Sequence, residues 1–465
     1  MRLRLSSIFS VAFALGVFAS PIACSEDRGG FDDRTADSGV ADSPSTSDDD
    51  DDAGGNASDA GADVDAAVPD IRVDCQVTPC AVALAARGGA HVCALLSDET
   101  VACWGADDKG QLGRGASDDG DDPDRGAHPA KVVGVSGATQ ISAVGAGTSG
   151  TSCARSKDGS VMCWGANTHG QLLPGASTAT TDDDPHPTPV RIEGLASAAR
   201  IEVTGAFACA VERDSTDLAG ELECWGDNSV LQLGRGYSPK THGGIAKVAL
   251  GFRSVIAVSG TLRNAFAISS DGELLSWGGS TWEIGGSTPV RDALGRESSI
   301  SPDGTPTPIP GLTNVTSVSA SEEHACAVAG GRVYCWGKNP TGAIGNGSRQ
   351  DVPIPYAVKT GAAQPLRDVA VSNRTTCARA VDGAIYCWGD NADGQLGDGK
   401  GASTLYPVWV ENVGGRVVQV VAMDRATCAL LADGSVTCWG SNDSGQLGLG
   451  KRDDDTHYTP RKVVF

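Results

Sequence analysis

The sequence predicts an all-β fold, a seven-bladed β-propeller, and three observations lead to this expectation. A Trp-centred segment occurs seven times along the chain, with successive spacings of 60, 61, 52, 59, 52 and 51 residues. A period of that length is typical of a propeller or solenoid with one supersecondary unit per repeat. Each unit contains short β-rich runs separated by Gly and Asp turns, with no sustained helical period. The seven tryptophans are Trp104, Trp164, Trp225, Trp277, Trp336, Trp388 and Trp439.

Residues 1–24 have the layout of an export signal. Two arginines precede an apolar run, residues 8–18, that is too short to span a bilayer as a stable helix. The segment ends in the tetrapeptide PIAC, residues 21–24, which resembles the lipobox of bacterial lipoproteins. We therefore expect a lipid on Cys24. The alternative is ordinary secretion with cleavage nearby, for example after Ala19.

Residues 25–74 are predicted to be a disordered linker. They hold sixteen acidic residues against three arginines, and the rest is mainly Ser, Gly and Ala. Such a segment buries too little apolar surface to offset the entropy of ordering. We expect a self-repelling tether in front of the propeller domain, residues 75–465. A calcium site at the aspartate run 48–52 is the lesser interpretation, because the run lacks the alternating spacing and the turn glycine of calcium loops.

The cysteines of the repeats occupy facing positions of predicted β-hairpins. Cys153 and Cys163 flank a turn centred on Asp158, so their Cβ atoms are expected to face each other within disulfide reach. We expect one such disulfide in each of six units. The pairs are Cys93 with Cys103, Cys153 with Cys163, Cys209 with Cys224, Cys326 with Cys335, Cys377 with Cys387, and Cys428 with Cys438.

The fourth unit provides an internal control for these pairs. It has Phe266 and Ser276 at the two cysteine positions, so both sulfurs are missing together. Free core thiols and metal ligands remain the alternatives. Cys75 and Cys80 form a seventh candidate pair, which leaves Cys24 as the odd cysteine, in agreement with lipidation. Disulfides imply an oxidising compartment, as the export signal does.

The ring is expected to be closed by an N-terminal strand. The seventh unit ends at Phe465 without the β run that follows the P-x-x-V step of the other units. A β run without a predecessor, Ala81–Ala85, lies at the other end of the repeats. We predict that this run completes the last blade, because pairing there would remove exposed sheet edges.

The pattern D-G-x-V-x-C-W-G-x-N-x-x-G-Q-L-G-x-G resembles the repeat of the regulator of chromosome condensation family, whose fold is a seven-bladed propeller. Its clearest copies are Asp382–Gly399 and Asp433–Gly450, and the resemblance covers roughly residues 80–465. Leu173 stands where the motif has its last Gly, and the fourth unit reads GGSTWEIG. Those two units are therefore expected to be irregular blades.

The resemblance implies a binding function. The eukaryotic nuclear member of that family is a nucleotide exchange factor for a small GTPase and docks on chromatin, and other members are binding platforms. The export signal favours an extracytoplasmic protein partner instead, and the net charge of −22 argues against nucleic acid. We expect a monomeric, non-catalytic, protein-binding propeller on the bacterial cell envelope. Nucleotide exchange on a small GTPase and an envelope enzyme acting on polysaccharide are the alternatives.

Enzyme signatures are weak in this chain. A G-x-G-x-x-G match at Gly145–Gly150 leads into a cysteine hairpin rather than a helix N-terminus. G-x-S-x-G and H-E-x-x-H patterns do not occur, and we expect neither cofactor nor metal. His91 and His324 occupy neighbouring positions in two repeats and are expected to pack between repeats. The same holds for the repeated tryptophans, with an aromatic ligand cage as the lesser alternative.

Loop length points to one candidate binding surface. The segment after the Trp is longest in units one, two and four, at Ser117–His128, Ser177–His186 and Glu283–Thr305. These segments enter at the same point of the repeat, so we expect them on one face of the ring, where repeat proteins often bind partners. Two are rich in aspartate, which predicts an acidic rim for a basic protein or a cation; tolerated loop drift is the alternative. The aspartates are Asp118, Asp119, Asp121, Asp122, Asp124, Asp182, Asp183 and Asp184.

Overall fold

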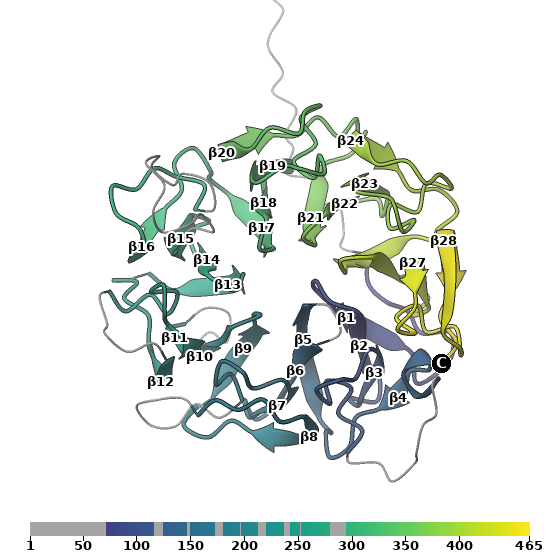
Figure 1. Ribbon diagram of the computed structural model, residues 1–465, viewed down its shortest axis with the longest axis horizontal. Coiled ribbons are helices and arrows are strands. Elements are labelled where there is room, and N and C mark those ends of the chain that lie inside the picture. Colours follow the sequence, from purple (N-terminus) through teal and green to yellow (C-terminus); the bar gives the residue numbers. More distant parts are fainter. Residues whose placement is uncertain are drawn as a thin grey trace, which may run out of the picture. The chain divides into compact units, whose positions relative to one another are not determined.

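The computed structural model describes residues 71–115, 124–146, 149–172, 180–195, 197–212, 220–236, 242–251, 253–279 and 294–465. Residues 66–465 form one compact unit. Within it, seven four-stranded antiparallel sheets surround a central axis (Figure 1). In every sheet the strands follow in chain order from the axis to the rim. The predicted seven-bladed β-propeller is confirmed.

Each blade is one continuous stretch of chain with four strands. From blade one to blade seven the strands are β1 (Ala81–Ala85), β2 (His91–Leu96), β3 (Val101–Gly105) and β4 (Ala130–Lys131); β5 (Ala138–Ala146), β6 (Ser149–Ser156), β7 (Val161–Gly165) and β8 (His186–Arg191); β9 (Ala198–Val203), β10 (Phe207–Glu212), β11 (Leu222–Asp227) and β12 (His242–Lys247); β13 (Val255–Gly260), β14 (Asn264–Ser269), β15 (Leu274–Gly278) and β16 (Asp303–Pro308); β17 (Val315–Ala320), β18 (His324–Ala329), β19 (Arg332–Gly337) and β20 (Val352–Ala357); β21 (Leu366–Val371), β22 (Thr375–Ala380), β23 (Ile385–Gly389) and β24 (Thr404–Trp409); β25 (Val417–Ala422), β26 (Ala426–Leu431), β27 (Val436–Asn442) and β28 (Asp453–Lys462). A short 3-10 helix, η1 (Arg125–Ala127), precedes β4.

The second and third strands of each blade form the predicted hairpin. Cys153 lies directly opposite Cys163, with the two Cα atoms 4.1 Å apart. All six predicted hairpin pairs and Cys75 with Cys80 are joined as disulfides. In blade four Phe266 faces Ser276 in the same register. The hairpin turn of blade one has Glu99 at a φ of 62°, the left-handed conformation that glycine adopts in the hairpin turns described in blades two and four to seven.

The N-terminal strand differs from the prediction. β1 pairs with β2, with Leu84 opposite Ala94, so it completes blade one and not blade seven. Blade seven has no vacancy for a donated strand, because the C-terminal stretch forms its own outer strand, β28. The ring closes through side-chain packing and a few backbone hydrogen bonds instead, such as the one from the Gly450 N–H to the Ala127 carbonyl at 3.0 Å. Leu84 and Val92 of blade one share a buried cluster with Val421 and Met423 of blade seven.

The repeated tryptophans join neighbouring blades. Trp164 Nε1 donates to the Gln111 carbonyl at 2.8 Å, and Trp439 Nε1 donates to the Gln395 carbonyl at 2.9 Å. Trp104 makes the same bond to Gln446 of blade seven at 3.1 Å, which closes the ring. All seven tryptophans are fully buried. The prediction that they pack between blades is confirmed.

In six blades of the described chain, the Gly-rich bend after the Trp presents a backbone carbonyl to the Trp of the next blade. In blade six, Asn391 Oδ1 accepts the Leu396 N–H at 3.0 Å, which draws the bend into a compact loop. Gly397 then lies against the next Trp, since a Cβ there would be 2.6 Å from Trp439 Nε1. The motif W-G-x-N-x-x-G-Q-L-G is therefore an interblade joint. Leu173, which replaces this Gly in blade two, lies outside the described residues.

The two repeat histidines are also interblade contacts. His91 Nε2 lies 3.0 Å from Ser152 Oγ, and the Ser152 hydroxyl donates onward to the Gln111 carbonyl at 3.0 Å. His324 Nε2 lies 2.6 Å from Thr376 Oγ1 in the same arrangement. Burial lowers the pKa of His91 to about 4 and that of His324 to about 3. Both imidazoles are therefore neutral packing groups at neutral pH.

Candidate binding face and central channel

The two ends of the ring carry different connections. In an antiparallel blade, the links from first to second strand and from third to fourth strand emerge on one end, which we call the loop face. The turns between second and third strands and the links between blades emerge on the opposite end, the turn face. The three long segments all connect third and fourth strands. Each of them therefore starts and ends on the loop face.

The described part of the acidic rim is tied into the loop face. Asp124 Oδ1 accepts the backbone N–H of Arg452 at 2.7 Å, which links the long segment of blade one to blade seven. The Asp183 carbonyl accepts from Lys109 Nζ at 2.5 Å. The Asp183 carboxylate is 86% exposed, and Asp184 is exposed beside it. Asp118, Asp119, Asp121 and Asp122 lie outside the described residues.

Asp182 has a structural role that is repeated in blade seven. Its carboxylate accepts from Asn167 Nδ2 at 2.6 Å and contacts His186 Nε2 at 2.7 Å. Asp453 makes the corresponding contacts with Asn442 and His457. Partial burial works to raise the pKa of Asp182, but the Asn167 and His186 contacts outweigh it and hold the pKa below its usual value. Asp182 therefore stabilises the bend, and Asp183 and Asp184 are the described members left facing solvent.

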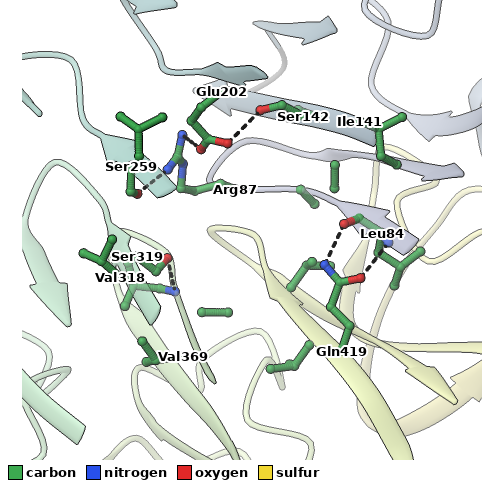
Figure 2. A pocket seen from close by; sticks show the side chains of 18 residues that line it. Leu84, Arg87, Ile141, Ser142, Glu202, Ser259, Val318, Ser319, Val369 and Gln419 are labelled. Atoms are coloured by element: carbon green, nitrogen blue, oxygen red, sulfur yellow. Dashed lines mark hydrogen bonds and ion pairs between the residues drawn. The ribbon is translucent and has the colours of Figure 1, made fainter. Parts of the chain in front are cut away.

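The seven innermost strands enclose a channel with a cavity of about 240 Å³ (Figure 2). Arg87 follows β1 and reaches across this channel. Its guanidinium pairs with Glu202 of blade three at 2.9 Å and donates to Ser259 Oγ of blade four at 2.8 Å. Ser142 of blade two donates to the other side of the Glu202 carboxylate at 3.2 Å. The ion pair thus ties together blades that are not neighbours in the ring.

The charge state of Glu202 depends on this arrangement. Burial inside the ring raises the pKa of the Glu202 carboxyl, and the Arg87 charge and the Ser142 hydroxyl work against that rise. Among the described residues that line the cavity, Glu202 is the one carboxylate. Hydrolysis of a glycosidic bond usually needs two carboxyl groups flanking the bond. The described lining of this cavity therefore offers no such pair.

Polar side chains also connect adjacent innermost strands. Gln419 of blade seven accepts from the Leu84 N–H and donates to the Leu84 carbonyl, both at 2.8 Å (Figure 2). Ser319 accepts the Val371 N–H at 3.1 Å across the boundary of blades five and six. These groups bridge backbones that the twist of adjacent blades holds too far apart for a β ladder. Most polar side chains of the channel lining therefore hold neighbouring blades together.

The loop-face mouth of the channel carries two carboxylates in the described loops. Asp424 accepts N–H groups of Gly89 at 3.2 Å and Asn373 at 3.3 Å. Glu322 lines a neighbouring cavity. Burial first, and then the nearby Asp424, raises the pKa of Glu322, and burial also raises the pKa of Asp424. In the described ranges, no group of three or more His, Cys, Asp or Glu side chains is placed to hold a metal ion.

Sequence reasoning found the loop segments and the cysteines but missed Arg87, Glu202 and Gln419. The sequence signal that could have revealed them was the position of Glu202 within its strand. Glu202 is the fifth residue of its innermost strand, where the other blades have Ala, Ser or Val. A lone charged residue at a position otherwise small or apolar would have indicated a partner elsewhere in the ring.

Comparisons with known proteins identify the repeat type. Two profiles described as "Regulator of chromosome condensation (RCC1) repeat" match the chain, one at residues 330–379, 382–430 and 433–465, the other at 141–171, 315–342, 366–395 and 417–446. The chain thus contains repeats of the regulator of chromosome condensation type. These matches agree with the resemblance seen in the sequence motif.

Curated relatives and solved structures agree with this class. The ultraviolet-B receptor UVR8 of Arabidopsis thaliana is 29% identical over 81% of this chain and 80% of its own length. The mouse E3 ubiquitin-protein ligase HERC2 is 30% identical over 49% of this chain, but the match spans only 5% of that protein. Yeast RCC1 (Prp20), solved bound to Kap60, superposes with a TM-score of 0.62 at 17% identity, covering 85% of this chain and 88% of that one. This last likeness shows the fold.

No helix in the described ranges is both long enough and apolar enough to cross a membrane. The export signal and Cys24 lie outside those ranges, as does most of the predicted linker.

Proposed function

We propose that this protein is a non-catalytic protein-binding propeller, exported and anchored to a bacterial cell envelope through a lipid on Cys24, whose loop face captures a basic protein partner. The observation that carries the proposal is that the two faces of the ring hold different parts of the chain. The long connections begin and end on the loop face, while the chain enters the propeller on the turn face.

The entry of the chain is defined by contacts with turns between second and third strands. The Asp74 N–H donates to the Ala432 carbonyl at 2.7 Å, and Ile71 packs beside Gly383. Cys80 packs against Gly434. These three partners belong to the hairpin turns of blades six and seven, on the turn face. The chain therefore joins the ring on the face opposite the long connections.

The disulfides support an extracytoplasmic location. All fourteen cysteines of the propeller are paired. Structural disulfides of this number are typical of oxidising compartments. The exposed Asp183 and Asp184 favour a partner with a basic surface, because charge complementarity guides encounter and orientation.

Nucleotide exchange on a small GTPase is the second candidate, supported by the repeat type and by the fold likeness to yeast RCC1. An oxidised, exported protein would not meet a cytosolic GTPase. Exchange activity would therefore require a reduced cytosolic pool of the chain. Measured acceleration of nucleotide release from a bacterial small GTPase would favour this candidate over envelope display.

The test is capture from the native envelope with variants of the loop face. The exported, oxidised protein is crosslinked in its own cells, purified and analysed for partners. In one variant Asp118, Asp119, Asp121 and Asp122 become Asn; in another Asp183 and Asp184 become Asn. Asp124 and Asp182 are kept, because both hold the loop face together. We expect both variants to lose the crosslinked partner at low salt, and the difference from the wild type to shrink as added salt screens the charges.

Matched controls separate binding from folding and anchoring. A variant with Asp454 and Asp455 changed to Asn removes similar charge from the start of β28, in a blade without a long aspartate-rich segment; both residues are exposed. Its capture should equal that of the wild type. Intact mass of the purified protein shows whether Cys24 carries a lipid. A partner retained by both loop variants would refute the acidic rim, and a chain without lipid would refute the anchor.

A further inference from the structure

Trp409 is an exposed aromatic residue that the propeller does not need. The chain has nine tryptophans, of which seven are the buried interblade residues and Trp282 lies outside the described ranges. Trp409 is 56% exposed at the end of β24, opposite Tyr386. The residues at the same register position in the other six blades are Lys131, Arg191, Lys247, Pro308, Ala357 and Lys462. Six blades fold without an aromatic residue there, so its presence calls for another explanation.

Trp409 forms one wall of a cavity on the turn face. The cavity has a volume of about 340 Å³ and lies between the hairpin turn of blade six, residues 382–385, and the link to blade seven, residues 410–416. Small-molecule sites commonly measure about 300–1,000 Å³. The aliphatic side chains of Ile385, Val410 and Val413 are buried beneath it. The floor is therefore apolar and rigid.

The rim of the cavity carries polar groups that the fold leaves available. Asn412 and Arg416 are exposed, and no hydrogen bond or ion pair of their side chains occurs in the described part of the chain. Asp382 uses one carboxylate oxygen for the Ala384 N–H at 3.0 Å. The link also holds Gly414 and Gly415, where no side chain narrows the cavity. An amide, a guanidinium and a carboxylate thus surround one exposed indole.

We propose that this cavity binds a pyranose ring of a glycan. The face of an indole carries the negative part of its quadrupole, and the C–H groups on the apolar face of a pyranose carry partial positive charge. The sugar hydroxyls both donate and accept hydrogen bonds. Asp382 accepts from them, Arg416 donates to them, and the Asn412 amide does both. A single sugar unit fits the flat wall and the mixed rim together.

A peptide is a poorer match for this cavity. Peptide grooves supply successive pockets for alternate side chains or an edge strand for main-chain pairing. Here the neighbouring edge strand β24 contains Pro407, which cannot donate to an added strand. The cavity lies on the turn face, apart from the acidic loops. Sugar binding there can therefore be tested independently of the proposed capture of a protein.

The experiment is titration of the full, oxidised protein with defined tetrasaccharides. Cellotetraose, chitotetraose, maltotetraose and β-1,4-mannotetraose are tested by calorimetry, and saturation-transfer NMR identifies the sugar protons in contact with protein. We expect at least one to bind one-to-one with a Kd below about 1 mM. W409K, which installs the residue found in three sibling blades, should weaken binding by about tenfold or more. N412A and R416A should each weaken it about threefold.

Tyr406 provides the matched control. It lies on the same strand, is 62% exposed and does not line the cavity. Y406A should bind as the wild type does, and saturation should reach the C–H protons of one sugar face. Absence of binding by all four tetrasaccharides would overturn the proposal. So would equal affinity of W409K and wild type at unchanged thermal stability, or an equal loss in Y406A.

Discussion

The Arg87–Glu202 pair is an ion pair that crosses the channel. Arg87 side-chain atoms reach blades three and four from blade one, and among the described strands no pairing joins blade one to either of them. Removal of the guanidinium leaves the Glu202 carboxylate without its counter-charge inside the ring. Breaking such a pair from one side is costly, because the remaining charge stays desolvated.

We expect R87M to lower the free energy of unfolding by roughly 1–3 kcal/mol at pH 7. Without Arg87 the raised pKa of Glu202 should rise further above the ordinary value of 4.5. The unfolded chain then ionises more readily than the folded one, so stability should fall as pH rises above 4.5. Urea unfolding of R87M between pH 4.5 and 7 measures this slope. R87M/E202Q should show a shallower slope; equal slopes would contradict the assignment.

For His91 and His324 we expect the opposite dependence of folding stability on pH. Their folded pKa values, about 4 and about 3, lie below the ordinary 6.5. The unfolded chain therefore binds protons first as pH falls, and stability is lost below pH 6.5. Each histidine contributes a slope of about 1.4 kcal/mol per pH unit. Urea midpoints of wild type and H91Q/H324Q at pH 4.5, 5.5 and 6.5 should converge as pH falls. A parallel dependence would show that other groups dominate.

At the scale of secondary structure, the feature that recurs in six blades is a β-hairpin whose two strands are joined by a disulfide. The same register brings two cysteines together in six blades and Phe266 with Ser276 in blade four. Blade four shows that the hairpin geometry does not require the disulfide. The bond therefore acts mainly on the unfolded chain, which it keeps from opening.

We expect C377A/C387A to fold with the same strand pairing and to lose roughly 2–3 kcal/mol of unfolding free energy, the chain-entropy value for a loop of this length. Guanidinium unfolding without reductant, compared with the wild type, measures the loss. Reduction of the wild type should lower stability by more, since six hairpins lose their bonds together. Unchanged stability of the double variant would mean that this cross-link does not restrain the unfolded chain.

At the scale of the whole molecule, ring closure uses the same joint as five other blade boundaries in the described part of the chain. Trp104 bonds to Gln446 as Trp164 bonds to Gln111, although the first pair is far apart in sequence and the second is near. The predicted strand exchange between the first and last blades does not occur. Closure therefore rests on packing and on scattered hydrogen bonds, including the pair between Gln419 and Leu84.

We expect W104F and W164F to lower the unfolding free energy by similar amounts, roughly 2 kcal/mol each, because each leaves a buried carbonyl without its donor and a small void. Thermal unfolding of the two variants tests this. A much larger loss in W104F would show that the first junction is the weak point of the ring. W409K, which leaves every interblade joint intact, is the control and should unfold as the wild type does.

The blade and its hairpin were predictable from sequence because their contacts are local. Trp spacing defined the repeat, and the facing positions of Cys153 and Cys163 followed from the length of a single turn. The bend residues Asn391 and Gln395 were visible as a motif, although their role as an interblade joint was not. Loop lengths indicated which face carries the long connections, because antiparallel pairing alternates the two ends of the ring.

The contacts across the ring were not predictable, because they join residues whose separation in sequence has no fixed period. Arg87 meets Glu202 and Ser259 only after seven blades have closed around the axis. The place of β1 was misjudged because one β run can pair with either neighbour, and only the outer strand β28 decides which blade is complete. In the sequence alone, Trp409 looks like any other aromatic residue. Its significance appears in the strand register, where the other six blades have no aromatic residue at that position. The repeat sequence by itself determined the pairing of neighbouring strands. The channel and the cavity on the turn face were decided by the tertiary structure, because they form only when the blades close into a curved ring.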